Sequence, residues 1–375
     1  MSAASSQTPY RVAIVGTGGI ATAHATALAE LAGRATLVAV CDTDRVRADA
    51  FAAEWGNPLV YTDLDELLQA ERPDLVHICT PPGSHVALAK RCLGAGVPAL
   101  IEKPPALSLA DMHALARAQE ETGVPVLTVF QHRFGSAAVR LRELLGTGVL
   151  GRPLVAACNT LWYRDAEYFA VPWRGSWAAE GGGPTMGHGI HQFDLLLSVL
   201  GEWQEVTAVA GRQSRPTETE DVSLAIVRFA SGALATIVNS VVSVRQTSSL
   251  RFDFENATVQ LEHLYGYTDA DWTLTTLPGH DEITDAWAGD RTELPSGHTA
   301  QLAAVFDAFD AGTPPPVGLA DSTATMELVA AIYASAFTRR PVRRGEIDAD
   351  SPFYTGMEGS GAPWAAAAEV QAVPA

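Results

Sequence analysis

Short apolar runs alternate with longer, partly polar segments along the first third of the chain. The runs predict buried strands at residues 11–15, 36–41, 74–80, 97–101 and 124–130. Helices are predicted over residues 21–31, 63–70 and 108–122, and another begins near Ser84, whose hydroxyl is a typical N-cap. Strands that alternate with helices at this spacing predict an α/β fold with a doubly wound parallel sheet.

The pattern changes after Gly151. Residues 153–161 read as a strand, and a run of short, often alternating β-rich segments begins after residue 205, at residues 221–229, 233–243, 250–254, 257–263 and 272–277. Consecutive strands joined by short turns predict a mostly antiparallel sheet, which can bury one face and leave the other for a partner. Two helical segments follow, at residues 299–311 and 319–338.

These two patterns predict two domains. We expect a flexible N-terminus over residues 1–9, a first domain over 10–132 and a second, α+β domain over 133–345. The closing helix over 319–338 is a candidate to pack back on the first domain. The remaining residues, 346–375, form a C-terminal extension that is expected to be mobile from about residue 360.

Composition narrows the class of protein. The chain has 375 residues, 47% of them hydrophobic, and a net charge of −18, which argues against nucleic acid or an anionic membrane as a partner. No apolar stretch reaches about 18 residues, the usual minimum for a membrane span. The four cysteines form no CxxC pair and are predicted to be buried thiols in a reducing cytosol: Cys41, Cys79, Cys92 and Cys158. We therefore expect a cytoplasmic protein.

A glycine-rich turn, Gly16-Thr-Gly-Gly-Ile-Ala21, joins the first predicted strand to the first helix. Gly16 permits a tight turn, and Gly18 lets the backbone approach a pyrophosphate at the helix N-terminus. Asp42 ends the second strand, where a carboxylate accepts hydrogen bonds from the adenosine ribose and repels a 2′-phosphate. This arrangement favours NAD over NADP, and the nearby Arg45 and Arg47 are interpreted as exposed helix positions.

The stretch 98–105 delivers Glu102 and Lys103 to the carboxyl end of a strand, where ligands bind in open α/β sheets. The alternative is a solvated Glu-Lys pair at a strand exit. Other residues predicted at or just beyond strand ends are Thr80, Pro81, His85 and Gln131. Taken alone, His85 is better explained as a residue of a first helical turn than as a catalyst.

A second polar group lies in residues 181–194. His188, His191 and Asp194 are three residues apart, so they share one face of a helix. Such a face can be a metal site, a general-base cluster or a polar stripe, and no further zinc ligand is evident nearby. The preceding loop is rich in aromatic and arginine residues: Tyr163, Arg164, Tyr168, Trp173, Arg174 and Trp177.

Taken in order, these motifs resemble the Gfo/Idh/MocA family of oxidoreductases over about residues 10–345. The resemblance is carried by the glycine turn, Asp42, Thr80-Pro81 with His85, Glu102-Lys103-Pro104, Trp173-Arg174-Gly175, and residues 181–183 with His191 and Asp194. It implies a Rossmann domain followed by an α+β domain with a large, mostly antiparallel open sheet, often used for dimer or tetramer assembly. It also implies NAD(P)-linked oxidation of a hydroxyl on a sugar, polyol or related compound.

The resemblance also implies roles for single residues. Lys103 corresponds to the active-site lysine, His191 to the histidine near the substrate hydroxyl, and Asp194 to the carboxylate three residues later. Gly187 departs from the inositol dehydrogenases of the family, which have an aspartate there, so myo-inositol is disfavoured as substrate. Implied cofactor contacts are Gly16, Gly18, Gly19, Ile20, Asp42, Thr80, Pro81, His85, Glu102, Lys103, Gln131, Trp173 and Arg174. Implied substrate contacts are Lys103, Tyr163, Arg164, His188, His191 and Asp194.

The resulting hypothesis is an NAD-dependent dehydrogenase that needs no metal. His191 removes the hydroxyl proton, Lys103 stabilises or relays the charge, and Asp194 orients His191 or holds a neighbouring hydroxyl. Three alternatives remain open: a redox-neutral conversion with retained NAD, a catalytically silent sugar-sensing regulator, and a dehydrogenase of a small aldehyde or trans-dihydrodiol.

Overall fold

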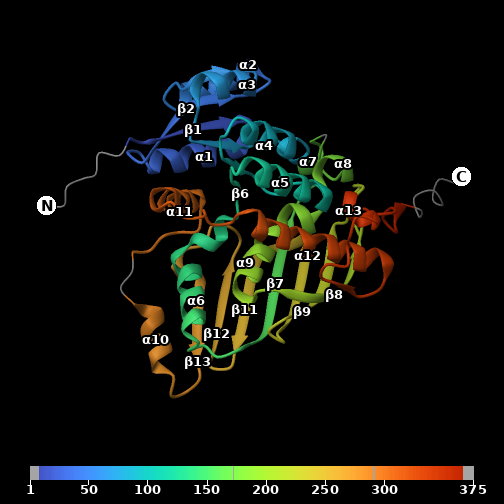
Figure 1. The fold of residues 1–375 in the computed structure, drawn as a ribbon. Coiled ribbons are helices and arrows are strands. Elements are labelled where there is room, and N and C mark those ends of the chain that lie inside the picture. The colour runs from blue at the N-terminus through green and yellow to red at the C-terminus, as the bar shows by residue number, and fades with distance from the viewer. Residues whose placement is uncertain (1–7, 172, 290–291, 366–375) are drawn as a thin grey trace, which may run out of the picture. The chain divides into compact units, whose positions relative to one another are not determined.

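The computed structural model describes residues 8–171, 173–289 and 292–365, and these form two compact units (Figure 1). The first unit runs to Pro105 and also contains residues 112–129 and 298–320. The second unit contains residues 106–111, 130–297 and the chain from Asp321 onward. Residues 298–320 thus belong to the first unit, whereas the predicted boundaries place them in the second domain. Within the expected flexible N-terminus and mobile tail, residues 1–7 and 366–375 lie outside the described residues.

The first unit is built on a parallel sheet with strand order β3-β2-β1-β4-β5-β6, which confirms the predicted doubly wound α/β architecture. Its strands are β1 (Tyr10–Val15), β2 (Ala35–Cys41), β3 (Leu59–Tyr61), β4 (Leu75–Ile78), β5 (Ala99–Ile101) and β6 (Val126–Thr128). Strand β3 was not predicted, because its apolar run is only three residues long. All the other strands match predicted runs.

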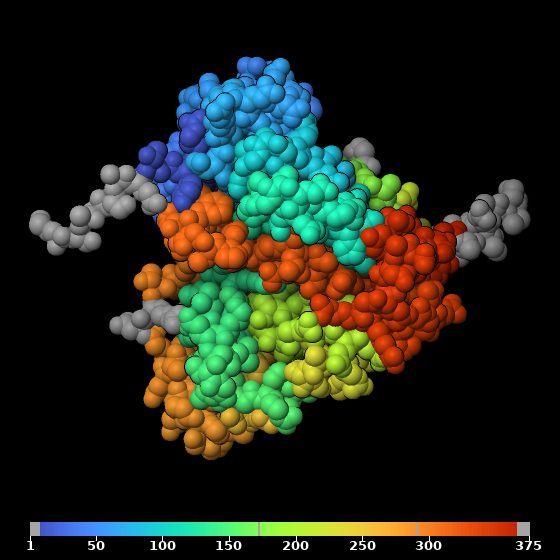
Figure 2. Space-filling view, viewed as in Figure 1, coloured from blue at the N-terminus to red at the C-terminus, as the bar shows by residue number. Residues whose placement is uncertain are grey.

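Helices connect these strands and cover the sheet. They are α1 (Gly19–Glu30), α2 (Arg45–Glu54), α3 (Leu64–Glu71), the short turn η1 (Pro82–Ser84), α4 (His85–Gly94) and α5 (Leu109–Thr122). A helix from far along the chain, α11 (His298–Ala311), completes the unit by adding Leu302, Val305 and Phe306 to its core. Phe306 stacks on Tyr10 of β1 with ring centroids 4.9 Å apart. In Figure 2 this orange segment lies against the blue N-terminal strand and helix.

The second unit contains an eight-stranded sheet of order β13-β12-β11-β7-β10-β9-β8-β14, in which only the β7–β10 pair is parallel. The predicted large, mostly antiparallel sheet is thereby confirmed. Its strands are β7 (Pro153–Tyr163), β8 (Trp203–Gly211), β9 (Val222–Phe229), β10 (Leu234–Ser240), β11 (Val242–Phe254), β12 (Ala257–His263), β13 (Trp272–Thr276) and β14 (Val342–Arg343).

Strand β8 was not predicted, and β11 and β14 also differ from the predicted strands. The predicted run 233–243 covers β10 and the first two residues of β11, and the run 250–254 covers the end of β11. Residues 244–249 were missed because they are mostly polar and give no apolar signal. The edge strand β14 is only two residues long and pairs with β8 through Val342 and Arg343. A strand this short depends on its neighbour and has no pattern of its own.

One face of this sheet is covered by helices, and in Figure 1 α6 (Ser136–Thr147), α9 (Ile190–Leu200) and α12 (Leu319–Thr338) lie on the same side of it. The alternation in β9, where every second residue is buried, agrees with one covered and one open face. The remaining elements of the unit are η2 (Gln131–Phe134), α7 (Ala166–Phe169), α8 (Trp177–Glu180), the π-helical turn η3 (Thr185–Gly189), η4 (Asp269–Asp271), α10 (Asp281–Ala288) and α13 (Pro352–Thr355).

The closing helix α12 packs within the second unit. Its Ser335 hydroxyl accepts a hydrogen bond from the backbone of Ala208 at 2.9 Å. The segment after it is attached as far as Trp364, which donates to the carbonyl of Glu218 at 2.8 Å and packs its ring against Phe337. No helix among the described residues is both long and apolar enough to cross a membrane.

The glycines before η3 are required by close packing. A Cβ at Gly183 would lie 2.0 Å from the carbonyl oxygen of Glu220. The buried carboxylate of Glu220 accepts hydrogen bonds from the backbone of Gly183 and Thr185, each at 3.1 Å, and from the Tyr333 hydroxyl at 2.9 Å. Burial raises the pKa of Glu220 to about 7, against the opposing effect of these donors. The turn that carries His188 is therefore fixed to β9 and α12.

We expect Gly183→Ala to lower the free energy of unfolding by about 1–3 kcal/mol, because backbone must move to admit the methyl group. Gly146→Ala in α6 is the matched control, since a Cβ there meets nothing within 4 Å. Its stability should be unchanged or up to about 1 kcal/mol higher. Urea denaturation of both variants measures the difference, and equal stability of the two would contradict the packing argument.

Candidate functional site

The turn after β1 has the geometry of an anion-binding loop. Gly16 has a φ of +87°, and a Cβ there would lie 2.8 Å from Cγ2 of Thr80, so only glycine fits. At Gly18 and Gly19 a Cβ would meet nothing within 4 Å, and no side chain caps the N-terminus of α1. The first amides of α1 are thus available to a phosphate, beside the exposed Ile20. The residues present fit the pyrophosphate of a dinucleotide.

Asp42 lies at the end of β2 as an ionised acceptor. Its carboxylate accepts from the backbone and hydroxyl of Thr17, both at 2.8 Å, and from the backbone of Asp44 at 2.9 Å. Arg47, an exposed position of α2 as expected, also donates to it at 2.6 and 3.0 Å. Burial alone would raise the pKa of Asp42, but the donors Arg47, Asp44 and Thr17 hold it well below its usual range.

His85 connects two strand ends of the first unit. The ring is fully buried, with Nδ1 2.9 Å from the carbonyl oxygen of Pro104 and Nε2 2.8 Å from that of Thr80. Burial lowers the pKa of His85 against the pull of these two carbonyls. The histidine therefore holds the segment after β5 against the segment after β4, on the Pro104 side of Lys103.

Glu102 is anchored on the other side of Lys103 by two histidines. Its Oε1 lies 2.9 Å from Nε2 of His24 and 3.2 Å from Nε2 of His298, while Oε2 accepts from the backbone of Lys103 at 3.1 Å. Nδ1 of His24 lies 3.0 Å from Nδ1 of His77. Glu102 is only 5% exposed, which rules out the alternative of a solvated Glu-Lys pair.

Burial would raise the pKa of Glu102, but the hydrogen bonds from His24 and His298 hold it well below its usual range. Among the described residues, His24, Glu102 and His298 are also the one group close enough to hold a metal ion. Direct hydrogen bonds account for their arrangement. Neither histidine was singled out from the sequence, because His24 lies in an alanine-rich helix and His298 is 196 residues from Glu102.

In the second unit, His191 lies on α9 and is 2% exposed. Its ring packs against those of His132 and Tyr265, with centroids 4.9 and 5.8 Å away. Gln131, predicted as a cofactor contact, donates to the hydroxyl of Tyr265 at 2.5 Å. No pattern in the sequence groups His132 or Tyr265 with His191, since the three residues come from separate segments.

Asp194 forms a buried ion pair. It is fully buried, and its two oxygens accept from Nε and Nη2 of Arg133 at 2.6 and 2.5 Å. Arg133 also contacts Asp321 of α12 at 2.9 Å. Burial raises the pKa of Asp194 to about 6, while Arg133 opposes that rise. That Asp194 orients His191 or holds a hydroxyl stays a prediction, and the structure adds that each of its oxygens accepts from Arg133.

The aromatic and arginine-rich loop forms one connected cluster around His188. Nε2 of His188 lies 3.3 Å from Nε of Arg164 and 3.3 Å from the Tyr168 hydroxyl. Tyr168 in turn accepts from Arg174, which lies 3.4 Å from Glu180 and stacks on Trp173 at 4.4 Å. The exposed Tyr163 is stacked instead by Arg215, at 4.9 Å.

Glu180 is a residue that the sequence did not suggest. It is 6% exposed and accepts from the backbone of Gly175 at 2.7 Å. A Cβ at Gly187 would lie 3.5 Å from its Oε1. A carboxylate thus lies beside the position where the resemblance leads one to expect an aspartate.

The predicted residues therefore form two groups. Gly16, Gly18, Gly19, Ile20, Asp42, Thr80, Pro81, His85, Glu102 and Lys103 belong to the first unit, at and beyond the carboxyl ends of its strands. Gln131, Tyr163, Arg164, Trp173, Arg174, His188, His191 and Asp194 belong to the second.

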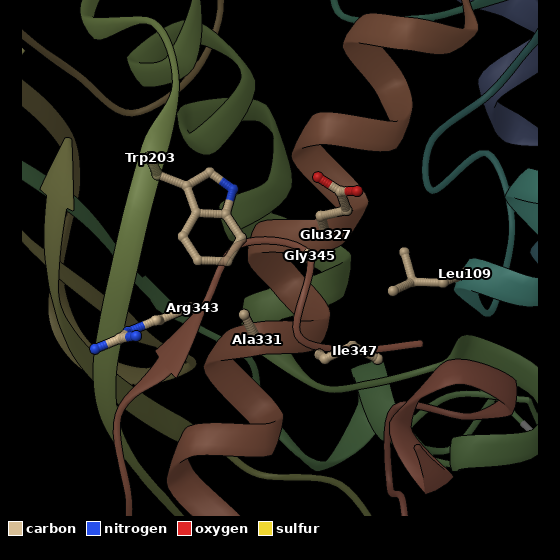
Figure 3. A pocket seen from close by; sticks show the side chains of 7 residues that line it. All are labelled: Leu109, Trp203, Glu327, Ala331, Arg343, Gly345 and Ile347. Carbon is tan, nitrogen blue, oxygen red and sulfur yellow. The ribbon is translucent and has the colours of Figure 1, made fainter. Parts of the chain in front are cut away.

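A separate pocket of the second unit lies between β8, α12 and the segment around β14 (Figure 3). Its lining residues are Leu109, Trp203, Glu327, Ala331, Arg343, Gly345 and Ile347. The charged members have partners, since Glu327 pairs with Arg344 and Arg343 with Glu205. It contains none of the predicted site residues and is not the candidate active site.

Two protein-family models match this chain. The model described as an oxidoreductase family with an NAD-binding Rossmann fold matches residues 10–130. The model of the GFO/IDH/MocA C-terminal domain matches residues 138–260. The predicted resemblance and the predicted NAD-binding domain are confirmed.

Individual relatives are similar over most of the chain. D-glucoside 3-dehydrogenase of Escherichia coli K12 is 28% identical and aligns over 90% of this chain and 98% of its own. D-apiose dehydrogenase of Paraburkholderia graminis is 28% identical over 92% of each chain. The WlbA dehydrogenase of Bordetella pertussis, solved with NADH and UDP-GlcNAcA, superposes with a TM-score of 0.80 at 26% identity, over 90% of this chain and 99% of its own.

We expect Asp194→Asn to lower the free energy of unfolding by about 3–5 kcal/mol, because it leaves the buried charge of Arg133 without its main partner. Asp321→Asn is the control. It removes the outer partner of the same arginine. Because the Asp321 side chain is 42% exposed, the substitution should cost less than about 1 kcal/mol. Thermal and urea unfolding measure both. An Asp194→Asn protein that unfolds like the wild type would contradict the assignment of this residue to a structural ion pair.

Proposed function

Because the chain belongs to the Gfo/Idh/MocA oxidoreductase family, we propose that it oxidises a secondary hydroxyl of a sugar, sugar derivative or polyol with NAD. D-glucoside, D-apiose and inositol dehydrogenases among its relatives favour this class of substrate. When bound, NAD accepts the hydride of the carbinol carbon at nicotinamide C4.

The observation that carries the proposal is how the backbone around Lys103 is held. Glu102 before it is fixed by two histidines, and the carbonyl of Pro104 after it is fixed by His85. Such support on both sides positions a side chain at the carboxyl edge of the sheet more rigidly than an ordinary loop would.

The choice of lysine at this position supports a proton-handling role. The sequence has only two lysines, Lys90 and Lys103, among 25 basic residues. Arginine serves wherever a permanent charge is needed, but a guanidinium does not release its proton in proteins, whereas an ammonium does. Lys103 is therefore the basic side chain suited to exchange a proton with a substrate hydroxyl.

His191 is the proposed base for that hydroxyl, and Lys103 stabilises the developing alkoxide or passes the proton on. The rings of His132 and Tyr265 hold the imidazole from the side. Asp42 would accept from the adenosine ribose and disfavour the 2′-phosphate of NADP, because its carboxylate is ionised.

We expect Lys103→Arg to lower kcat by about 10²–10⁴-fold, since it keeps the charge but loses the exchangeable proton. Lys90→Arg, at an exposed position of α4, is the matched control and should retain full activity. Reduction of NAD, and separately of NADP, is followed by absorbance against sugars, sugar acids and polyols. Full activity of Lys103→Arg would contradict the role of Lys103, and a preference for NADP would contradict that of Asp42.

The open face of the large sheet supports a homodimer or homotetramer. Val155, Val209, Leu224, Ile226 and Leu234 are each at least 40% exposed, and Leu224 pairs with Val209 while Leu234 pairs with Val155. Several large apolar side chains exposed on one sheet face favour a protein contact.

Light scattering should therefore give a dimer or tetramer, and Ile226→Asp should shift it to smaller species because a charge cannot be buried in that contact without a partner. Val46→Asp, at an exposed apolar position of α2, is the control and should leave the assembly unchanged. A monomeric wild-type protein would refute this part of the proposal.

A further inference from the structure

Two guanidinium groups of the second unit gather on one aromatic ring. Cζ of Arg174 lies 3.9 Å and Cζ of Arg164 lies 5.1 Å from the centre of the Tyr168 ring. Arg164 also lies 4.7 Å from the centre of the Trp162 ring. Stacking on the π-faces holds both cations in place without neutralising them.

The charge of this cluster is not balanced. Arg174 has one carboxylate, that of Glu180 at 3.4 Å. Among the described residues, no carboxylate oxygen lies within 4.0 Å of a nitrogen of Arg164. In a chain with a net charge of −18, Arg164 is half-buried and has no acidic partner among the described residues.

The bonds that Arg164 does make leave donors available. Nη1 donates to the carbonyl of Tyr163 at 3.1 Å, and Nε donates to Nε2 of His188 at 3.3 Å. A guanidinium has further N–H groups on Nη1 and Nη2, arranged as a fork that matches a carboxylate or phosphate.

The supporting residues fix the fork before any ligand arrives. Glu180 is anchored on the backbone of Gly175 and contacts Arg174, which donates to Tyr168, whose hydroxyl lies 3.3 Å from His188. Side chains that are already ordered lose little conformational entropy when they bind a ligand. His188 is three residues from His191, so the open donors of Arg164 lie near the helical turn that carries the proposed base.

We propose that Arg164, supported by Arg174 and Tyr168, binds an anionic substituent of the substrate, a carboxylate or a phosphate, and thereby sets substrate specificity. This inference rests on the proposed function in taking a sugar derivative as the ligand. It narrows the substrate class to sugars that carry a negative charge.

The test is a binding measurement, so that it does not depend on turnover. Calorimetry on the full-length protein saturated with NADH compares glucuronate, glucose 6-phosphate and neutral glucose. At least one anionic probe should bind about 10- to 100-fold more tightly than glucose, as expected for charge-assisted hydrogen bonds, and added salt should weaken only the anionic probes. The tighter of the two identifies carboxylate or phosphate as the recognised group.

Variants assign the effect to Arg164. Arg164→Gln should remove most of the advantage of the anionic probe over glucose, while Arg164→Lys should keep part of it. Arg152→Gln, at a surface arginine paired with Glu255, is the control and should behave like the wild type. Equal affinity for all three probes, or an anionic preference that survives Arg164→Gln, would overturn the inference.

The same measurements separate this inference from the proposed function. Reduction of NAD by a neutral sugar, unaffected by Arg164→Gln, would refute the anion site and leave the dehydrogenase standing. Tight, Arg164-dependent binding of an anionic probe without NAD reduction by any sugar would refute the dehydrogenase function and support the anion site.

Discussion

The burial of one carboxylate shapes the first unit. Glu102 lies where β5 ends, and a buried charge is tolerated only if partners replace the water it has lost. Those partners, His24 and His298, come from α1 and α11. Helix α11 follows most of the second unit along the chain, so the charge of Glu102 joins the end of one strand to a helix some two hundred residues away. The position of the Lys103 backbone follows from this arrangement, because Lys103 is the next residue and its amide donates to Glu102.

The second unit uses the same device. Asp194 and Arg133 form a buried ion pair that connects α9 with η2 and, through Asp321, with α12. His191 precedes Asp194 by less than one helical turn of α9. A movement of this turn that displaced His191 would therefore also break the ion pair. Each proposed proton-handling residue thus sits next to a buried, fully paired charge, which supplies rigidity that a loop lacks.

The local features of this structure were accessible from the sequence. Apolar runs identified five of the six parallel strands, and the glycine turn, Asp42 and Lys103 follow from what stands immediately before and after a strand. The features that were missed depend on distant partners. His24 and His298 acquire a role only through Glu102, and spacing on a helix did not reveal that Arg133 faces Asp194. The polar half of β11 was hidden because its neighbours, and not its own composition, make it a strand.

The glycine at position 187 also has a physical explanation that the sequence alone did not offer. An aspartate there would direct a second carboxylate toward Glu180, whose Oε1 is 3.5 Å from the place of a Cβ. Two carboxylates so close cannot both stay ionised at neutral pH, because like charges raise the pKa of one of them. A glycine at position 187 is therefore compatible with an ionised Glu180. The acid at the end of α8 contacts Arg174, so it presents a different pattern of donors and acceptors from an aspartate at position 187.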